Sequence, residues 1–397
     1  MSAQSERAVS PGHRISDIEV LRAIAVLFVV FQHLPNLFPW ELPSLTHLQA
    51  YIGGTFGVDL FFAVSGFVIA RDLVPRMLDA ADGHAARRIM LSFWLRRMWR
   101  LWPAAWLWLG LILLASVAFN TSGAFGSVSA NLWGAVAGVF QFANVRFAEN
   151  FMVRESGASF VYWSLSLEEQ FYLLFPLLIL LFKRQLGWFM LSVAVVQLCL
   201  SRTPYLMVFR TDALALGVLI ALWSNRQSWH RWSRPFAALQ MPGRLLLLVI
   251  AVGAMAVISG NNFFNGYAFL VITPVSALVV WMAAYDADFV MRAGPLKRVL
   301  MWVGSRSYAI YLIHIPAYFA IRELFFRLGL AASPSFPLLL AYLVCGISLL
   351  LLLAELNYRF VEVPLRRYGV AFSARLIAAP VQRIGEQAAP VETVSRA

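Results

Sequence analysis

The stretch VLRAIAVLFVVFQHL, residues 20–34, decides the fold, because it is apolar enough to cross a membrane and yet carries two ionisable side chains. Arg22 lies near its start and His33 lies deep inside it. A spanning helix needs about 20 apolar residues, and an ionisable group within it belongs in the interior of a helical bundle. At about 100° per residue, the two side chains share one helix face, roughly 16 Å apart along the axis. The stretch therefore predicts one polar seam inside a bundle.

The whole chain has the composition of a membrane protein. Of its 397 residues, 60% are hydrophobic and 13% are charged, which is about half the charge of an ordinary soluble domain. We predict an all-α, polytopic protein of the inner or plasma membrane with about ten transmembrane helices. The predicted spans are 18–38, 53–70, 101–118, 164–182, 187–201, 206–224, 245–259, 267–285, 303–321 and 337–356. The shorter run 131–143 predicts an interfacial or re-entrant piece.

The basic residues predict the orientation of these helices. With the N-terminus inside, 25 of the 32 Lys and Arg residues fall in predicted cytoplasmic regions, and five fall in outer connections. Cytoplasmic loops collect basic residues, so both termini are predicted to be cytoplasmic. The same rule accounts for the formal net charge of +12 without a nucleic-acid partner.

The domain organisation follows from these spans. We predict one membrane domain over residues 1–370 and a disordered cytoplasmic tail over 371–397. The connection 71–100 is predicted to be a long basic cytoplasmic loop, and the outer stretch 119–163 to form a lid or part of an acceptor site. Both cysteines lie in apolar runs, which predicts neither a disulfide nor a metal site.

Several polar groups inside the predicted spans are candidates for chemistry. His33 is a candidate general base, because the charge of imidazole changes near neutral pH. Asp59, in GVDLFFAVSGF (57–67), is either an interfacial carboxylate or a group that orients a histidine or an acceptor hydroxyl. Ser65, six residues later, either bonds back to its own helix or serves the site.

The stretch FWLRRMWRLWPAAW, residues 93–106, allows two interpretations. Arg96, Arg97 and Arg100 with the neighbouring tryptophans form either a positive-inside anchor with an aromatic belt or a clamp for phosphate groups. In WSLSLEEQFY (163–172), Glu168 and Glu169 are candidate ligand groups. Alternatively, Ser166 and Glu169 have the spacing of a capping box.

Two later stretches add polar groups. FRTDALALG (209–217) carries Arg210 and Asp212 on different sides of one helix, and YAIYLIHIP (308–316) carries His314 well inside a span. Arg22 and the arginines of 96–100 are predicted on the cytoplasmic side, with the histidines in between. The groups predicted toward the outside are Asp59, Glu168, Glu169, Arg210 and Asp212. This pattern predicts an anionic ligand that enters from inside and a polar acceptor that approaches from outside.

Seven motifs in order resemble the acyltransferase-3 family of membrane acyltransferases. They are LRAIAVLFVVFQH (21–33), GVDLFFAVSGF (57–67), RRMWRLWP (96–103), WSLSLEEQFY (163–172), FRTDALALG (209–217), SYAIYLIHIP (307–316) and YRFVEVPLRR (358–367). The resemblance implies ten helices and transfer of an acyl group, often acetyl, from cytoplasmic acyl-CoA to a hydroxyl. The implied acceptors are sugars of surface glycans or glycolipids, or glycosylated small molecules.

The resemblance also implies roles for individual residues. His33 is similar to the family's catalytic histidine, Arg22 to its partner arginine, and Arg97 and Arg100 to its Arg-x-x-Arg pair. We expect catalysis by His33 with Arg22 and Asp59, and no metal. Acyl-CoA binding is expected at Arg22, Arg96, Arg97 and Arg100, and acceptor binding at Glu168, Glu169, Arg210, Asp212 and His314.

A different class of function stays open at this point. A proton-coupled secondary transporter or lipid-linked sugar flippase would also line its path with polar groups, and His33 and Asp59 could act as its proton relay. No phosphate-binding loop, zinc-protease motif or dinucleotide fingerprint is present in the sequence, so ATP-driven transport and zinc proteolysis have no support.

Overall fold

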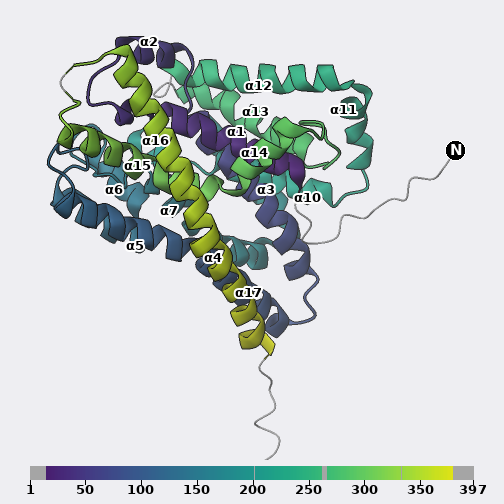
Figure 1. The fold of residues 1–397 in the computed structure, drawn as a ribbon. Coiled ribbons are helices and arrows are strands. Elements are labelled where there is room, and N and C mark those ends of the chain that lie inside the picture. The colour runs from purple at the N-terminus through teal and green to yellow at the C-terminus, as the bar shows by residue number, and fades with distance from the viewer. Residues whose placement is uncertain (1–14, 201, 262–265, 332, 379–397) are drawn as a thin grey trace, which may run out of the picture.

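The computed structural model describes residues 15–378 except 201, 262–265 and 332, and all its regular elements in this part are helices (Figure 1). The first half contains α1 (Ser16–Gln32), η1 (Leu34–Leu37), α2 (Pro43–Tyr51), α3 (Phe56–Leu78), α4 (Gly83–Ala118), α5 (Val128–Val139), α6 (Ala143–Asn150), α7 (Tyr162–Phe182), η2 (Lys183–Gln185) and α8 (Leu186–Cys199). The second half contains α9 (Pro204–Val208), α10 (Asp212–Ser224), η3 (His230–Ser233), α11 (Arg234–Ala238), α12 (Met241–Asn261), η4 (Gly266–Ala268), α13 (Phe269–Ala283), α14 (Pro295–Ser305), α15 (Ser307–Arg327), α16 (Phe336–Asn357), η5 (Tyr358–Glu362) and α17 (Val363–Ala378). The predicted all-α class is confirmed.

Among the described residues, six segments are long and apolar enough to cross a membrane. A seventh is reached if α2 and α3, which bend by 48°, form one broken span. The six are Gly83–Ala118, Tyr162–Cys199, Pro204–Ser224, Met241–Gly260, Ser307–Arg327 and Phe336–Arg375. These segments make the chain a multi-pass membrane protein. Ten spans and two cytoplasmic termini stay predictions.

Helix α1 ends earlier than its sequence predicts. It stops at Gln32, so that His33 is the C-cap residue rather than part of a helix running to residue 38. Pro35 is the physical reason, because proline has no N–H to continue the ladder and its ring would clash with the carbonyl four residues earlier. The side-chain amide of Gln49 donates to the backbone oxygens of Phe31 at 2.7 Å and Gln32 at 3.2 Å. His33 therefore lies at a fixed helix end.

The prediction of a long cytoplasmic loop at 71–100 is wrong. Helix α3 continues to Leu78 and α4 already begins at Gly83, so only a short turn separates them. Asp82 caps α4 by accepting a hydrogen bond from the backbone N–H of Ala85 at 2.7 Å, which fixes the start of that helix. The basic stretch is consequently helical, and its arginines have defined directions.

The core of the molecule depends on close contact between α3 and α10. A Cβ atom at Gly66 of α3 would overlap the backbone of Leu214, and a Cβ at Gly217 of α10 would overlap the carbonyl of Ala63. Small residues permit such backbone approach in membrane helices. This contact fixes α3 in the centre of the bundle, against α1, α7 and α13 as well.

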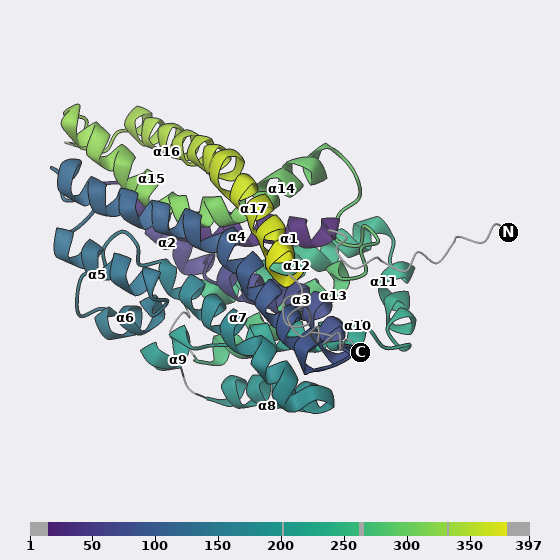
Figure 2. The same cartoon turned by 90° about the horizontal axis from the view of Figure 1, so that it is seen from below.

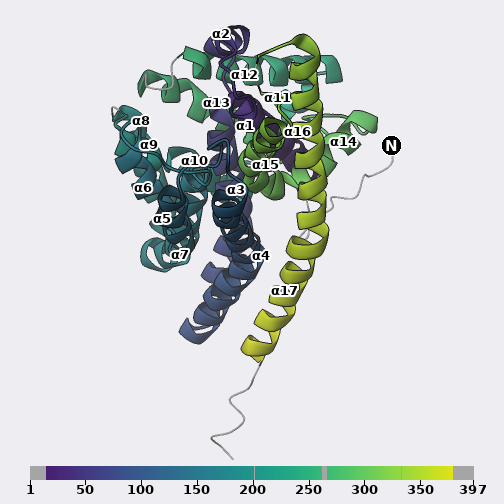
Figure 3. The same cartoon turned by 60° about the vertical axis from the view of Figure 1, so that its left-hand side comes forward.

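The C-terminal helices α16 and α17 follow one another through η5, and α17 lies beside α4. Figures 2 and 3 show α17 next to α4, and Figure 3 shows its C-terminal end away from the main body. The ring of Trp99 in α4 contacts Tyr368 with a centroid distance of 4.7 Å, and it occupies the space above Gly369. Helix α17 runs to Ala378, so the first eight residues of the predicted disordered tail 371–397 are helical. Residues 379–397 lie outside the described part.

Candidate functional site

A cavity with an empty volume of about 760 Å³ lies between α1, α3, α4, α7 and α15, and we call it the central cavity. One side of the wall is apolar and comes mainly from α3. The polar groups of the wall are Arg22, Ser65, Arg97, Arg100, Ser164, Glu168, Tyr172, Ser307, Tyr308 and Tyr311.

Three arginines from two helices meet at this cavity. Arg22 comes from α1, whereas Arg97 and Arg100 come from α4 and face the same space. The Arg97 guanidinium lies 5.1 Å from the centroid of the Tyr172 ring. In the described part of the chain, no carboxylate lies within 4 Å of the Arg97 or Arg100 guanidinium. Arg22, in contrast, lies 3.9 Å from the carboxylate of Glu19. Arg97 and Arg100 therefore retain positive charge for an anionic ligand.

Arg96 does not share this position. It does not line the central cavity, and its electrostatic neighbours are Arg76 and Asp72 near the end of α3 as well as Arg97. Successive residues of a helix point about 100° apart, which explains why Arg96 and Arg97 diverge. Of the four arginines predicted to bind the donor, the structure brings three together.

Glu168 belongs to the same cavity as the arginines. Its carboxylate accepts hydrogen bonds from the hydroxyls of Ser65 at 2.8 Å and Tyr172 at 2.9 Å. Arg22 and Arg97 act on it electrostatically. The sequence predicted Glu168 and these arginines on opposite sides of the membrane, and that separation is wrong, because α7 packs between α3 and α4 and carries Glu168 into their shared space.

Glu169 points to a different space. Its carboxylate accepts a hydrogen bond from the indole of Trp102 at 3.1 Å and lines a smaller cavity next to the central one. The capping-box alternative for Ser166 and Glu169 is wrong, because α7 begins at Tyr162 and both residues lie inside the helix. The Ser166 hydroxyl accepts a hydrogen bond from the backbone N–H of Ala143 at 3.2 Å instead.

His33 and His314 form a hydrogen-bonded pair, although they lie 281 residues apart. Nε2 of His314 lies 3.0 Å from Nδ1 of His33, and Nδ1 of His314 lies 2.7 Å from the backbone oxygen of Tyr311. His314 is fully buried, whereas His33 is partly exposed. The structure places His314 in contact with His33, and the role in acceptor binding that the sequence assigned to His314 stays a prediction.

These contacts determine which nitrogen of each neutral ring carries the proton. A carbonyl oxygen can only accept, so Nδ1 of His314 donates to Tyr311 and Nε2 of His314 is left as an acceptor. Nδ1 of His33 must then donate to that nitrogen. Nε2 of His33 is consequently unprotonated and can take a proton.

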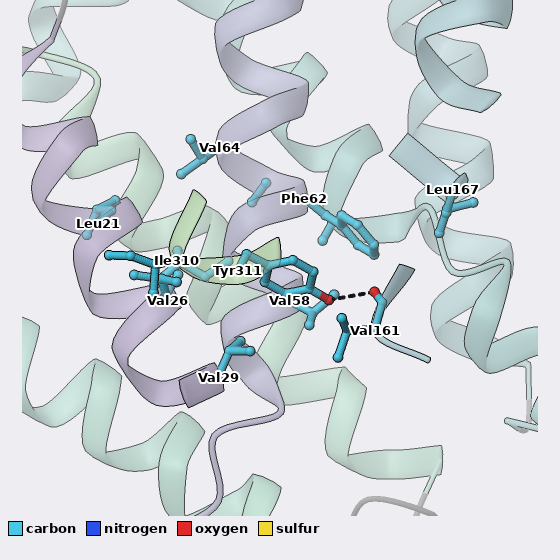
Figure 4. Packing of buried hydrophobic residues seen from close by; sticks show 14 of the residues in the cluster. Leu21, Val26, Val29, Val58, Phe62, Val64, Val161, Leu167, Ile310 and Tyr311 are labelled. Carbon is cyan, nitrogen blue, oxygen red and sulfur yellow. Dashed lines mark hydrogen bonds between the residues drawn. The ribbon is translucent and has the colours of Figure 1, made fainter. Parts of the chain in front are cut away.

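Tyr311 connects the histidine pair to the central cavity. Its backbone oxygen holds His314, while its side chain lines the cavity. The phenol donates to the carbonyl of Val161 at 3.0 Å, as Figure 4 shows, and its oxygen lies 2.7 Å from the hydroxyl of Ser164. His33 and His314 do not themselves line the central cavity, and Tyr311 is the residue that contacts both the cavity and His314.

Asp59 and Arg210 form a buried ion pair on another face of α3. Nε of Arg210 lies 3.1 Å from Oδ1 of Asp59, and both side chains are 1% exposed. Beside them, Arg202 contacts Asp212 at 2.5 Å, and Thr273 donates to the same carboxylate at 3.2 Å. None of these residues lines the central cavity. Their predicted roles in catalysis and acceptor binding stay predictions, without a direct contact to His33.

The structure adds several residues that the sequence did not single out. Tyr172, Ser164, Tyr308 and Tyr311 supply hydroxyls to the central cavity. Tyr172 is four residues after Glu168 and Tyr311 is three residues before His314, which are the spacings of helical neighbours. That spacing was available in the sequence, but nothing in it distinguishes these tyrosines from ordinary core residues.

Comparison with known proteins gives one family. The model of the acyltransferase-3 family, described as an acyltransferase domain, matches residues 15–355. The chain is 26% identical to peptidoglycan O-acetyltransferase OatA of Listeria monocytogenes, over 89% of this chain and 56% of that protein. It is also 26% identical to O-acetyltransferase OatA of Staphylococcus aureus, over 92% of this chain and 59% of that protein.

The chain spans less than three fifths of the length of these curated relatives. No solved structure matches it.

Proposed function

Because this chain belongs to the acyltransferase-3 family, we propose that it is a membrane O-acyltransferase that moves a short acyl group, acetyl in the simplest case, from acyl-CoA to a hydroxyl of a sugar-containing acceptor. The names of its relatives support acetyl transfer, and one of them names peptidoglycan. The observation that carries the proposal is the His33–His314 hydrogen bond, since it leaves an unprotonated ring nitrogen on His33.

The donor end of the proposed site is the arginine cluster. CoA carries a pyrophosphate and a further phosphate, and arginine binds such groups through two parallel hydrogen bonds. Arg22, Arg97 and Arg100 face one cavity together with a single glutamate, so positive charge is in excess there. The acyl end of the donor then extends along the cavity toward Tyr311 and the histidine pair.

The chemistry follows from these positions. An acyl thioester is already activated, so the enzyme has to place a hydroxyl against its carbonyl carbon and remove the proton of that hydroxyl. Nε2 of His33 takes the proton as the new C–O bond forms. The C–S bond then breaks, and the CoA thiolate recovers the proton from His33, which yields the ester and free CoA.

The test uses purified protein in detergent, with acetyl-CoA as the donor. Acetyl-CoA should raise the melting temperature of the wild type, because a ligand at 100 times its Kd stabilises a protein by about 2.7 kcal/mol. His33→Ala should keep this shift in melting temperature. Its rate of acetyl transfer to membranes from the cells that produce the protein should fall roughly 10²–10⁴-fold. Absence of the shift, or full transfer by the variant, contradicts the proposal, and absence of the shift is the result that a transporter would give.

A further inference from the structure

A groove lies beside the end of α1 that carries His33. It is formed by η1, the connection that follows η1 and the start of α2, and we call it the outer groove. Its volume of about 360 Å³ lies within the range of small-molecule sites, roughly 300–1,000 Å³. The lining residues are Pro35, Phe38, Pro39, Trp40, Glu41, Leu42, Leu45 and Thr46.

The outer groove begins two residues after His33. Two residues of extended chain span at most about 7 Å, so Pro35 in the wall lies next to the candidate base. Asn36 holds this part of the wall in place, because its backbone N–H and its side-chain amide both donate to the carbonyl of His33, at 3.0 and 3.1 Å. Figures 1 and 3 show α2 at the end of the molecule opposite α17. The predicted orientation puts that end outside, where the acceptor is expected.

Aromatic rings make up part of the wall and are fixed from behind. Trp40 is partly exposed, and its indole N–H donates to the backbone oxygen of Ala331 at 3.0 Å. The rings of Trp40 and Phe38 both pack on Tyr342, with centroid distances of 5.4 and 5.9 Å. Walls that are rigid before a ligand arrives lower the entropic cost of binding. A flat aromatic surface of this kind suits the C–H face of a sugar ring.

Two polar side chains at the groove are available to a ligand. Glu41 and Thr46 are exposed, and the side chain of neither makes a hydrogen bond or an ion pair with another described residue. A carboxylate can only accept hydrogen bonds, so Glu41 favours a ligand with hydroxyl donors. No lysine or arginine lines the groove, so its charge disfavours a phosphate group. Apolar rings with a few hydrogen-bonding groups favour a neutral, hydroxyl-rich ligand.

We propose that the outer groove is a subsite for a neutral sugar ring of the acceptor, next to the part whose hydroxyl reacts at His33. The inference rests on the proposed function, because it takes His33 as the base. One face of the sugar ring packs on Trp40, and Glu41 and Thr46 bind its hydroxyls. His33 itself does not line the groove, so the bound ring is a neighbour of the reacting one and positions it.

The test probes the groove with thiol reagents and does not require the natural acceptor. Cys199 and Cys345, which are both exposed, are replaced by alanine, and Thr46→Cys is introduced in the groove. Leu48→Cys is the control, because Leu48 lies on the same helix, is 45% exposed and does not line the groove. Glucosyl and propyl methanethiosulfonate, both neutral, react with each cysteine in nanodiscs of zwitterionic phospholipid. The ratio of glucosyl to propyl rates at Thr46→Cys is divided by the same ratio at Leu48→Cys.

This normalised ratio should be roughly tenfold above one, because a hydrogen bond to a charged group contributes at least that factor. Glu41→Ala and Trp40→Ala should each bring it close to one. If Trp40→Ala does not fold, Glu41→Ala decides, since the Glu41 side chain is exposed. A normalised ratio of one or below, which a groove filled by lipid would give, overturns the proposal. A ratio that Glu41→Ala leaves unchanged also overturns it, as does faster reaction with trimethylammonium-ethyl methanethiosulfonate, which would indicate a cation site.

The glucosylated protein is then assayed with acetyl-CoA. The attached sugar occupies the groove, so labelled Thr46→Cys should lose acetyl transfer to membranes from the cells that produce the protein, while acetyl-CoA still stabilises it. Leu48→Cys with the same label should keep its transfer. Unimpaired transfer by labelled Thr46→Cys overturns the proposal. If acetyl-CoA does not stabilise the unlabelled protein, the proposed function fails, and the rate ratios still decide whether the groove binds a sugar.

Discussion

At the scale of single residues, the environment of each polar group decides what it can do. His33 is at a helix end, its proton is placed by His314, and its second nitrogen stays available. Asp59, for which the sequence predicted a catalytic role together with His33, forms a buried ion pair with Arg210. Removing one partner of such a pair leaves a buried charge and is strongly destabilising, so loss of activity in an Asp59 variant would not by itself indicate catalysis.

His314 is expected to act through His33 as a positioning residue. His314→Ala should lower kcat for acetyl transfer by roughly a hundredfold, because the His33 ring loses the acceptor that holds its proton on Nδ1. The KM for acetyl-CoA should stay unchanged. His314→Gln keeps an oxygen that can accept this hydrogen bond and should recover part of kcat. Equal kcat for the alanine and glutamine variants would contradict the positioning role.

Arg97 and Arg96 are neighbours on α4 and provide a matched pair of variants, because only Arg97 lines the central cavity. Arg97→Gln should weaken acetyl-CoA binding by tenfold or more, since a hydrogen bond to a charged group contributes about 1.5–3 kcal/mol. Arg96→Gln should leave the affinity within about twofold, because Arg96 does not line the central cavity. Isothermal titration with acetyl-CoA measures both. Equal losses of affinity would mean that both arginines act only through the general positive charge around the start of α4.

At the scale of helices, small residues and helix ends place the site. The packing of α7 against α3 brings Ser65 of α3 against Glu168 of α7. Helix α1 ends early, before Pro35, and His33 at this end contacts His314. Motif spacing within one helix predicted the shared face of Arg22 and His33. It could not predict the partners, because each partner lies on another helix, 103 residues away for Ser65 and 281 for His33.

Gly217 tests the contact between α3 and α10. Gly217→Ala should lower the melting temperature in detergent, because its Cβ overlaps the carbonyl of Ala63 and overpacking costs about 1–3 kcal/mol. Gly110→Ala in α4 is the control, since nothing lies within 4 Å of the added Cβ. Alanine exceeds glycine in helix propensity by about 0.8–1 kcal/mol, so the control should be neutral or stabilising. A stable Gly217→Ala protein would show that α3 and α10 can separate without cost.

At the scale of the whole molecule, the orientation in the membrane decides from which face each substrate arrives. The central cavity takes its charge from arginines of α1 and α4. The predicted orientation puts these arginines toward the cytoplasm and His33 toward the outer half of the membrane. Donor and acceptor would then reach His33 from opposite faces of the membrane.

Cysteine labelling in intact cells tests this orientation. In a background without Cys199 and Cys345, Val153→Cys in the outer stretch should react with an impermeant maleimide added to whole cells, because Val153 is 76% exposed. Gly83→Cys at the start of α4 should react only after the membrane is permeabilised. The reverse pattern would invert the predicted topology.

The sequence by itself determined that this is a multi-pass membrane protein, that its fold is all-helical and that it belongs to its family. Those properties depend on hydropathy, local periodicity and the order of motifs, all of which are visible in the amino-acid sequence alone. The tertiary structure alone decided that Glu168 joins the arginines, that Asp59 pairs with Arg210 and that His314 fixes the proton of His33. The reason is that a buried polar group must find its partner in space, and in a helical bundle that partner is on a neighbouring helix whose packing no local pattern specifies.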